Sequence, residues 1–402
     1  MKTKKNFRIT FKITNNSHNA VLKKDGIEVF ACGFDKGILQ VELYYDLRPE
    51  SLVLKAKADM GDSTEIVIMP HRIELWVNKT LMDEEWPAGN ILFDRLDGMN
   101  GNIQMDISEF IYEKPIFPKV TGSFENAQGW KPEENVFVGD CMPYVNNERY
   151  HILYLKDRHH HYSKWGLGAH QWAHISTSDF KKWDIHPMAV EITEEYEGSI
   201  CTGSWIKQGD KEYLFYTVRM VDGSPAKICR SISKDGFHFE KDKDFSFVLS
   251  DKYDGKCARD PKVIVDENGL SHMILTTALK VEKKGCLAHL TSKDLDVWAE
   301  EENPIYISLD ETEPECPDHF KYKEYYYLIY SLNGRANYLY SKEPFGKWEI
   351  PVDPIIPCSS VPKGAIWGDK IIFTGFKPEN GYAGTLTFRT ATSNNAGELI
   401  FK

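Results

Sequence analysis

No stretch of this chain approaches the roughly 20 consecutive apolar residues that a membrane-spanning helix needs. The charged first eight residues are not followed by the apolar run of about seven or more residues that marks a secretory signal. The eight cysteines form no CxxC pair and no spacing typical of zinc ligands. We therefore expect a cytoplasmic protein with reduced thiols, no membrane partner and no metal.

Basic residues are also in short supply. The chain carries 49 Lys and Arg against 60 Asp and Glu, a formal charge of -11. This balance argues against nucleic acid as a partner and fits a neutral carbohydrate. Aromatic residues make up 13% of the chain, which suits stacking on sugar rings and equally suits packing between β-sheets. The composition leaves the oligomeric state open.

A length of 402 residues is too great for one ordinary domain. Up to residue 118 the sequence shows short runs in which apolar and polar residues alternate, for example residues 37–45, 64–68 and 72–77. Alternation with a period of two over several short runs predicts an antiparallel β-sandwich domain, residues 1–118. Residues 119–132, rich in Gly, Ser, Asn and Pro, are expected to form a linker.

An internal repeat follows in residues 133–402. A small or charged turn leads to an aromatic residue at Trp183, Phe239, Trp298 and Trp348, with spacings of 56, 59 and 50 residues. A strand rich in Tyr, Leu or Ile precedes each turn, and a fifth such strand, residues 370–374, lies near the end. About 55 residues is one four-stranded blade with its loops, so we predict a five-bladed β-propeller. The predicted fold class is all-β, with the sandwich before the propeller.

Three acidic motifs occupy segments that we expect to be the innermost strands of blades one, three and four. They are Gly139-Asp140-Cys141, Arg259-Asp260-Pro261 and Glu315-Cys316-Pro317-Asp318. Because innermost strands line the axis of a propeller, the three carboxylates can converge there. Converging carboxylates suit nucleophilic and acid/base chemistry at the anomeric carbon of a sugar.

In this order the motifs resemble glycoside hydrolase family 32, the invertase and fructanase family, over residues 135–402. Arg259-Asp260-Pro261 and Glu315-Cys316-Pro317-Asp318 match two of its motifs. Three further segments are similar to family elements: Gly203-Ser204, the stretch from His170 to Trp183, and Gly381-Tyr382-Ala383-Gly384. The resemblance implies Asp140 as nucleophile, Asp260 as transition-state stabiliser and Glu315 as general acid/base. A cluster of like charges would help to keep Glu315 protonated between turnovers.

The sequence departs from the family at the first motif, where the family has Asn-Asp-Pro-Asn-Gly and this chain has Gly139-Asp140-Cys141-Met142-Pro143. The family commonly has Gln where this chain has Leu155-Lys156-Asp157-Arg158. These changes alter the floor of the expected sugar pocket and leave the catalytic acids in place. The sandwich, which usually follows the propeller in the family, here precedes it.

We predict a retaining, exo-acting hydrolase of furanosides, with β-fructosides as the expected substrates and no cofactor. The alternatives are a fructosyltransferase, an inverting hydrolase of the arabinan or xylan type, and a sugar-binding propeller without turnover. The predicted substrate-binding residues are Arg259, Asp157, Arg158, Trp165, His170, Trp172, Ser204, Asp318 and Trp367.

Each of these residues also has a structural reading. Asp140 could be a solvated turn residue, Arg259 and Asp260 a structural ion pair, and any one tryptophan could pack between blades. Residues 158–161, Arg-His-His-His, match no zinc motif, and adjacent residues of a strand point to opposite faces. Glu313 is expected to face solvent.

Overall fold

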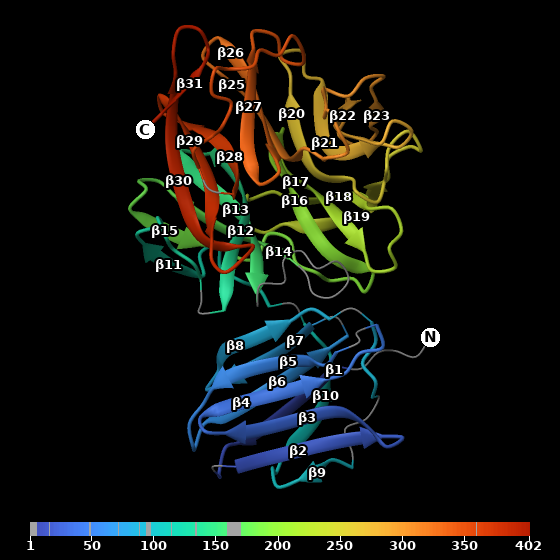
Figure 1. Cartoon of the computed structure of the whole chain (residues 1–402). Coiled ribbons are helices and arrows are strands. Elements are labelled where there is room, and N and C mark those ends of the chain that lie inside the picture. Colours follow the sequence, from blue (N-terminus) through green and yellow to red (C-terminus); the bar gives the residue numbers. More distant parts are fainter. Residues whose placement is uncertain are drawn as a thin grey trace. The chain divides into compact units, whose positions relative to one another are not determined.

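The computed structural model describes residues 6–15, 17–47, 50–70, 72–87, 89–93, 98–113, 115–132, 135–158, 170–358 and 360–402. Throughout these ranges the regular secondary structure is β-strand, as Figure 1 shows, and the all-β prediction is confirmed. None of these residues forms a helix long and apolar enough to cross a membrane. The chain divides into two compact units, one built mainly from residues up to Ile116 and the other from residues after it.

The N-terminal unit is a sandwich of two antiparallel sheets, drawn in blue to teal in Figure 1. One sheet has the order β10-β1-β6-β7-β8 and the other β5-β4-β3-β2-β9. The strands are β1 (Asn6–Lys12), β2 (Ser17–Lys24), β3 (Ile27–Asp35), β4 (Ile38–Leu43), β5 (Leu52–Lys57), β6 (Ser63–Met69), β7 (Arg72–Val77), β8 (Thr80–Glu85), β9 (Asn100–Gly101) and β10 (Asp106–Phe110). Alternate residues such as Leu39, Val41, Ile73 and Leu75 are fully buried between the sheets. This burial explains the period of two seen in the sequence.

The second unit is a propeller of five antiparallel blades, each running outward from an innermost strand (Figure 1). Blade 1 comprises β12 (Val136–Asn146), β13 (Arg149–Arg158), β14 (Gln171–Thr177), β15 (Lys182–Ile185) and β11 (Gly122–Glu125). Blade 2 comprises β16 (Glu197–Gln208), β17 (Lys211–Met220), β18 (Lys227–Ser233) and β19 (Glu240–Phe247). The three acidic motifs fall on the innermost strands of blades 1, 3 and 4, as predicted.

Blade 3 comprises β20 (Arg259–Val265), β21 (Ser271–Leu279), β22 (Lys284–Ser292), β23 (Ala299–Glu300) and β24 (Tyr306–Ile307). Blade 4 comprises β25 (Glu315–Tyr322), β26 (Tyr325–Leu332) and β27 (Arg335–Ser341). Blade 5 comprises β28 (Ser360–Trp367), β29 (Lys370–Pro378), β30 (Gly384–Ser393) and β31 (Leu399–Phe401). The pairing of Val138 with Gly384 joins the first blade to the last and closes the ring.

The repeated phrase in the sequence is the turn that follows the third strand of a blade. In blade 2 the Ser233 hydroxyl accepts the Gly236 amide over 2.9 Å, and Asp235 accepts the amides of Phe237 and His238 over 2.9 Å each. Ser292 and Asp294 make the same pattern in blade 3, and Thr177 and Asp179 make it in blade 1. A hydroxyl residue two positions before Asp therefore specifies the turn through local side-chain to backbone bonds.

The predicted linker, residues 119–132, is partly wrong. Its middle forms β11, which pairs with β15 as the outer strand of blade 1. Phe124 stacks on Trp130 with ring centroids 3.9 Å apart, and both pack against the core around Trp183. Burial of these aromatic side chains outweighs the turn-forming composition of the segment. The bounds 1–118 and 133–402 for the two domains stay a prediction.

Four innermost strands carry a β-bulge near their first residues, at Gly139-Asp140, Asp260-Pro261, Cys316-Pro317 and Val361-Pro362. In the last three the residue before proline has a positive φ, with values of 59° at Asp260, 51° at Cys316 and 39° at Val361. Proline has no amide to donate, so a bulge accommodates it. Bulges re-aim side chains, and strained backbone of this kind gathers at functional sites.

Candidate active site

Asp140 lies in the bulge of β12 and is held from two other blades. The Tyr382 hydroxyl, in the turn between β29 and β30, donates to Asp140 Oδ1 over 2.9 Å. The Cys316 thiol of blade 4 donates to Asp140 Oδ2 over 3.5 Å. Burial raises the pKa of Asp140 to about 7, and the charges of Asp260 and Glu315 add to this, whereas the bond from Tyr382 lowers it.

Asp260 is buried at the start of β20 and accepts two hydrogen bonds. The Thr202 hydroxyl of blade 2 donates to Oδ1 over 2.6 Å, and the Cys316 amide of blade 4 donates to Oδ2 over 3.0 Å. These two donors fix the orientation of the carboxylate. Asp140 and Asp260 both contact Cys316, so blades 1, 3 and 4 meet at this residue.

Arg259 connects the third acid to the other two. Its Nη2 donates to Glu315 Oε1 over 2.8 Å, its Nη1 donates to Glu313, and its Nε lies 3.7 Å from Asp260 Oδ2. The charges of Asp260, Glu313 and Glu315 raise the pKa of Arg259 even though burial alone would lower it. The expectation that Glu313 faces solvent is wrong in this respect, because its carboxylate is an ion-pair partner of Arg259. About half of the Glu315 side chain is exposed (49%), so the cluster opens to solvent on this side.

The structure brings the three predicted acids together, and it adds two residues that the sequence reasoning did not select. Thr202 lies two positions before Ser204 on β16, so alternation puts the two side chains on the same face. Ser204 itself bonds to backbone, donating to the Pro261 carbonyl over 2.9 Å and accepting the Val263 amide over 2.8 Å. Tyr382 lies in the segment Gly381–Gly384, which is similar to a family element. Nothing in the sequence assigned a role to its hydroxyl.

Several predicted substrate-binding residues are enclosed by protein. Asp157 Oδ1 pairs with His170 Nε2 over 3.0 Å, and Arg158 donates to Asn135 over 3.0 Å. Asp157, Arg158 and His170 are all buried, with exposed fractions of 1% or less. They can shape a site from behind, and in this structure they do not present a surface to a sugar.

The tryptophan predictions are corrected in favour of packing. Trp172 is fully buried, donates to the Cys201 carbonyl over 2.9 Å and meets Tyr216 edge to face. Trp367 is partly buried and meets Tyr150 and Phe180 edge to face against the core of blades 1 and 5. Trp165 lies outside the described residues.

Asp318 is also part of the protein frame. Its Oδ1 accepts Lys262 Nζ over 2.6 Å and the His319 amide over 2.9 Å, and its Oδ2 accepts the Gly364 amide over 2.8 Å. These bonds tie the innermost strands of blades 3, 4 and 5 together behind the acids. Asp318 also lines a cavity along the innermost strands, and its contact with substrate stays a prediction.

Histidines near the predicted site do not form a metal centre in the described part of the chain. His174 Nε2 lies 3.0 Å from His151 Nδ1, and both rings pack near His186. No group of three or more His, Cys, Asp or Glu in the described ranges is arranged to hold a metal ion. Residues 159–161 lie outside those ranges.

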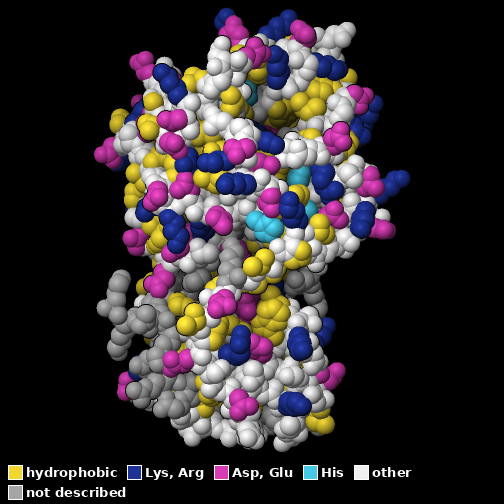
Figure 2. Space-filling model, turned by 180° about the vertical axis from the view of Figure 1, so that it is seen from behind, with side chains coloured by type: hydrophobic (Ala, Val, Ile, Leu, Met, Phe, Trp, Pro, Cys, Tyr) yellow, Lys and Arg dark blue, Asp and Glu magenta, His cyan; other side chains and the backbone are white. Residues whose placement is uncertain are grey.

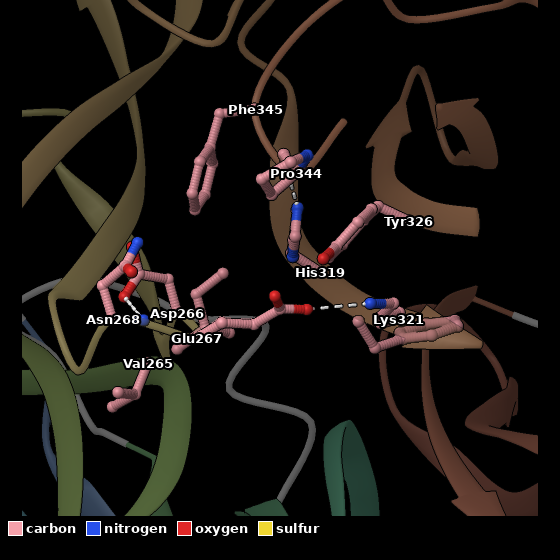
Figure 3. A pocket seen from close by; sticks show the side chains of 11 residues that line it. Val265, Asp266, Glu267, Asn268, His319, Lys321, Tyr326, Pro344 and Phe345 are labelled. Carbon is pink, nitrogen blue, oxygen red and sulfur yellow. Dashed lines mark hydrogen bonds and ion pairs between the residues drawn. The ribbon is translucent and has the colours of Figure 1, made fainter. Parts of the chain in front are cut away.

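Two cavities occur away from the acids. One, of about 330 Å³, lies along the innermost strands and is lined by residues such as Met142, Ser204, Lys262 and Lys363. The other, of about 360 Å³, lies between blades 3 and 4 and is drawn in Figure 3, where Glu267 reaches across to Lys321. Neither cavity is lined by Asp140, Asp260 or Glu315, so the geometry of the carboxylates identifies the candidate site more directly than cavity size does.

The fold and the site together define a five-bladed β-propeller in which carboxylates from three blades are linked through Cys316 and Arg259. The sequence model described as glycosyl hydrolases family 32 N-terminal domain matches residues 125–348, more than half of the chain. The chain therefore belongs to glycosyl hydrolases family 32.

Curated relatives cover only part of the chain. Sucrose-6-phosphate hydrolase of Vibrio alginolyticus is 24% identical over 195 residues, which is 46% of this chain and 39% of that protein. Sucrose-6-phosphate hydrolase of Escherichia coli is 27% identical over 198 residues, 47% of this chain and 39% of that protein. The chain thus matches about two fifths of the length of these relatives.

Solved structures confirm the fold. Fructan 1-exohydrolase IIa from Cichorium intybus superposes with a TM-score of 0.57 at 17% identity, covering 69% of this chain and 60% of that one. A thermostable family-43 glycoside hydrolase superposes with a TM-score of 0.51 at 16% identity, covering 69% and 96%. At these identities the likeness is one of fold.

Proposed function

We propose that this chain is a retaining, exo-acting glycoside hydrolase of furanosides, with β-fructosides as its substrates. The observation that supports this most is the meeting of Asp140, Asp260 and Glu315 from three blades through Cys316 and Arg259. Membership of family 32 adds to it, as does the likeness to relatives named sucrose-6-phosphate hydrolase. On the face drawn in Figure 2, acidic and basic side chains of the propeller are interspersed, which suits a neutral partner.

In the proposed mechanism the Asp140 carboxylate attacks the anomeric carbon while the Glu315 carboxyl protonates the departing oxygen. The glycosidic C–O bond breaks and a covalent glycosyl ester forms on Asp140. Glu315, now ionised, takes a proton from water, which attacks the same carbon and frees Asp140. Asp260 would accept hydrogen bonds from sugar hydroxyls that strengthen as positive charge develops on the ring. The proposed double displacement requires the carboxyls of Asp140 and Glu315 to lie about 5 Å apart.

Of the predicted binding residues, we propose that Arg259 orients the acids beside the sugar. The other described ones, Asp157, Arg158, His170, Trp172, Ser204, Asp318 and Trp367, would support the walls of the site from behind. Cytoplasmic location, and action without cofactor or nucleic acid, stay part of this proposal.

The test is sugar release by the purified protein from sucrose, sucrose 6-phosphate, short fructans and aryl furanosides. We expect monosaccharide as the first product, and loss of activity in Asp140→Asn and Glu315→Gln. Glu267→Gln, which changes an exposed carboxylate outside the cluster, serves as the matched control. With methanol as acceptor, retention gives the methyl β-fructoside, and the other anomer would indicate inversion.

The remaining outcomes separate the alternatives. Growth of fructosyl oligomers at high sugar concentration would identify a transferase. If the folded wild-type protein binds one of these sugars by calorimetry and releases sugar from none, the hydrolase proposal fails and the binding propeller takes its place.

A further inference from the structure

The Tyr382 hydroxyl occupies the space beside Gly139 that a side chain would otherwise fill. A Cβ atom built on Gly139 would lie 2.8 Å from Tyr382 Oη, closer than such contacts allow, and 3.1 Å from both the Cβ and the backbone oxygen of Leu155 on the paired strand. The same hydroxyl donates to Asp140 Oδ1 over 2.9 Å and accepts the Asp140 amide over 3.3 Å. Gly139 and Tyr382 are therefore complementary, although 243 positions separate them in the sequence.

The tyrosine ring is fixed on both sides. His170 stacks on it with ring centroids 5.4 Å apart, and Phe376 meets it nearly edge-on with centroids 5.2 Å apart. His170 is in turn bonded to Asp157, and both are buried. A ring fixed in this way can hold the carboxylate that it contacts in one orientation.

We propose that Tyr382 is the positioning residue of Asp140, and that a side chain at Gly139 would displace the Tyr382 hydroxyl, which is the nearest group to it. This inference rests on the proposed function only in that the proposed function makes Asp140 the nucleophile. It also assigns a role to the departure at the first motif, where the chain has glycine before the acid.

The charged and titratable groups around Asp140 come from four elements. Asp260 faces it from β20, Glu315 and Cys316 from β25, and Tyr382 from the turn before β30. Cys141 follows it on β12, and burial raises the pKa of that thiol. Tyr382 and Cys316 favour the ionised form of Asp140, while the two acids oppose it. Removing the hydroxyl therefore moves the Asp140 titration upward.

The experiment is carboxyl carbon NMR on protein labelled with ¹³Cγ aspartate, with the Asp140 signal assigned by its loss in Asp140→Asn. In Tyr382→Phe we expect the titration midpoint to rise by about one pH unit, since a hydrogen bond to a charged group contributes on this scale. Tyr327→Phe is the matched control, because its buried hydroxyl donates to the Gly397 carbonyl over 2.8 Å, away from the acids. An unchanged midpoint in folded Tyr382→Phe overturns the proposal.

Gly139→Ala provides a second route to the same answer. Its methyl group would push the Tyr382 hydroxyl aside, so the midpoint should rise as in Tyr382→Phe. Gly139→Ala combined with Tyr382→Phe should show the shift of one change rather than the sum, because both act on one hydrogen bond. Additive shifts would overturn the coupling between the two residues.

The activity assay adds a readout that a purely structural role would not move. If the hydrolase proposal holds, the acid limb of the kcat/KM profile should move upward in Tyr382→Phe by the same amount as the NMR midpoint. Since the NMR titration needs no substrate, failure of the hydrolase proposal leaves it interpretable. If the NMR midpoint shifts but the protein releases no sugar, the hydrolase proposal fails and the positioning role of Tyr382 stands.

Discussion

The guanidinium of Arg259 donates to Glu315 Oε1 over 2.8 Å, which links the innermost strands of blades 3 and 4 at the candidate site. The same side chain bonds to Glu313 and lies 3.7 Å from Asp260 Oδ2. One planar cation thus orients three carboxylates. Lysine offers the same charge from a single point and lacks the fork.

Arg259→Lys should lower kcat/KM by about 10- to 100-fold while the protein stays folded, because the fork that orients Glu315 is lost. Steady-state kinetics measures this. Arg230→Lys is the control, since Arg230 Nη2 pairs with Asp242 and Asp296 over 2.7 and 2.6 Å, away from the acids. Equal activity losses in the two variants would contradict a specific role of Arg259.

Glu315→Gln should reduce hydrolysis of sucrose-type substrates by about 10²- to 10⁴-fold, because no acid remains to protonate the leaving oxygen. An aryl furanoside with a good leaving group needs little protonation and should lose much less. Comparing kcat on the two substrates tests this. Glu313→Gln, which alters the neighbouring partner of Arg259, should affect both substrates alike. A Glu315→Gln loss that is independent of the leaving group would rule out the acid role.

Asp140→Asn should stabilise the protein at pH 8 by roughly 1–3 kcal/mol. The pKa of Asp140 in the fold is about 7, above its ordinary value of 3.8, so the folded state binds more protons than the unfolded state between these values. Wild-type stability attributable to this group therefore falls as the pH rises from about 4 to about 7. Urea unfolding at pH 4 and pH 8 measures the difference, which should nearly vanish at the lower pH. If Asp140→Asn differs from wild type in stability by the same amount at both pH values, a raised pKa of Asp140 is contradicted.

His151→Gln should flatten the loss of stability in acid. Burial lowers the pKa of His151 to about 3, with smaller effects from His186 and Arg149, so the folded protein keeps this ring neutral while the unfolded chain protonates below about 6.5. Such a group costs about 1.4 kcal/mol per pH unit as the pH falls through this window. Unfolding free energies at pH 6.5 and pH 5 give the slope.

His238 provides a control of opposite sign for this measurement. Its hydrogen bond to Asp235 raises its pKa, so its contribution to stability is present below about 6.5 and is lost as the pH rises through its raised pKa. His238→Gln should therefore lower stability by a constant amount well below pH 6.5, and this difference from wild type should shrink as the pH rises above 6.5. A His238→Gln difference that does not shrink above pH 6.5 would show that His238 does not act as described.

The blade repeat could be predicted because it depends on chemistry within a few residues. A hydroxyl at Ser233 or Ser292 and an aspartate two positions later close the turn through their own backbone neighbours. Likewise, alternation in β7 follows from one buried face. The linker was misread because the composition of residues 119–132 resembles a turn, whereas Phe124 and Trp130 are held by distant aromatic partners.

The three carboxylates were predictable as types and as positions on innermost strands, together with their resemblance to a family. Their partners were not. Ser204 was selected where Thr202 contacts Asp260, because both lie on one face of β16 and only the neighbouring blade distinguishes them. Trp172 and Trp367 could have faced a sugar or a blade, and packing decided for the blade.

The sequence by itself determined the β class, the number of blades and the strands that carry acids, since turns and alternation are encoded by near neighbours. Only the tertiary structure decided that Tyr382 would reach Asp140 and that Arg259 would bridge to Glu315. Those contacts exist because the ring closes and brings the first, third, fourth and fifth blades to one axis. The local sequence pattern of one strand cannot identify a contact with a distant strand that only closure of the ring brings near.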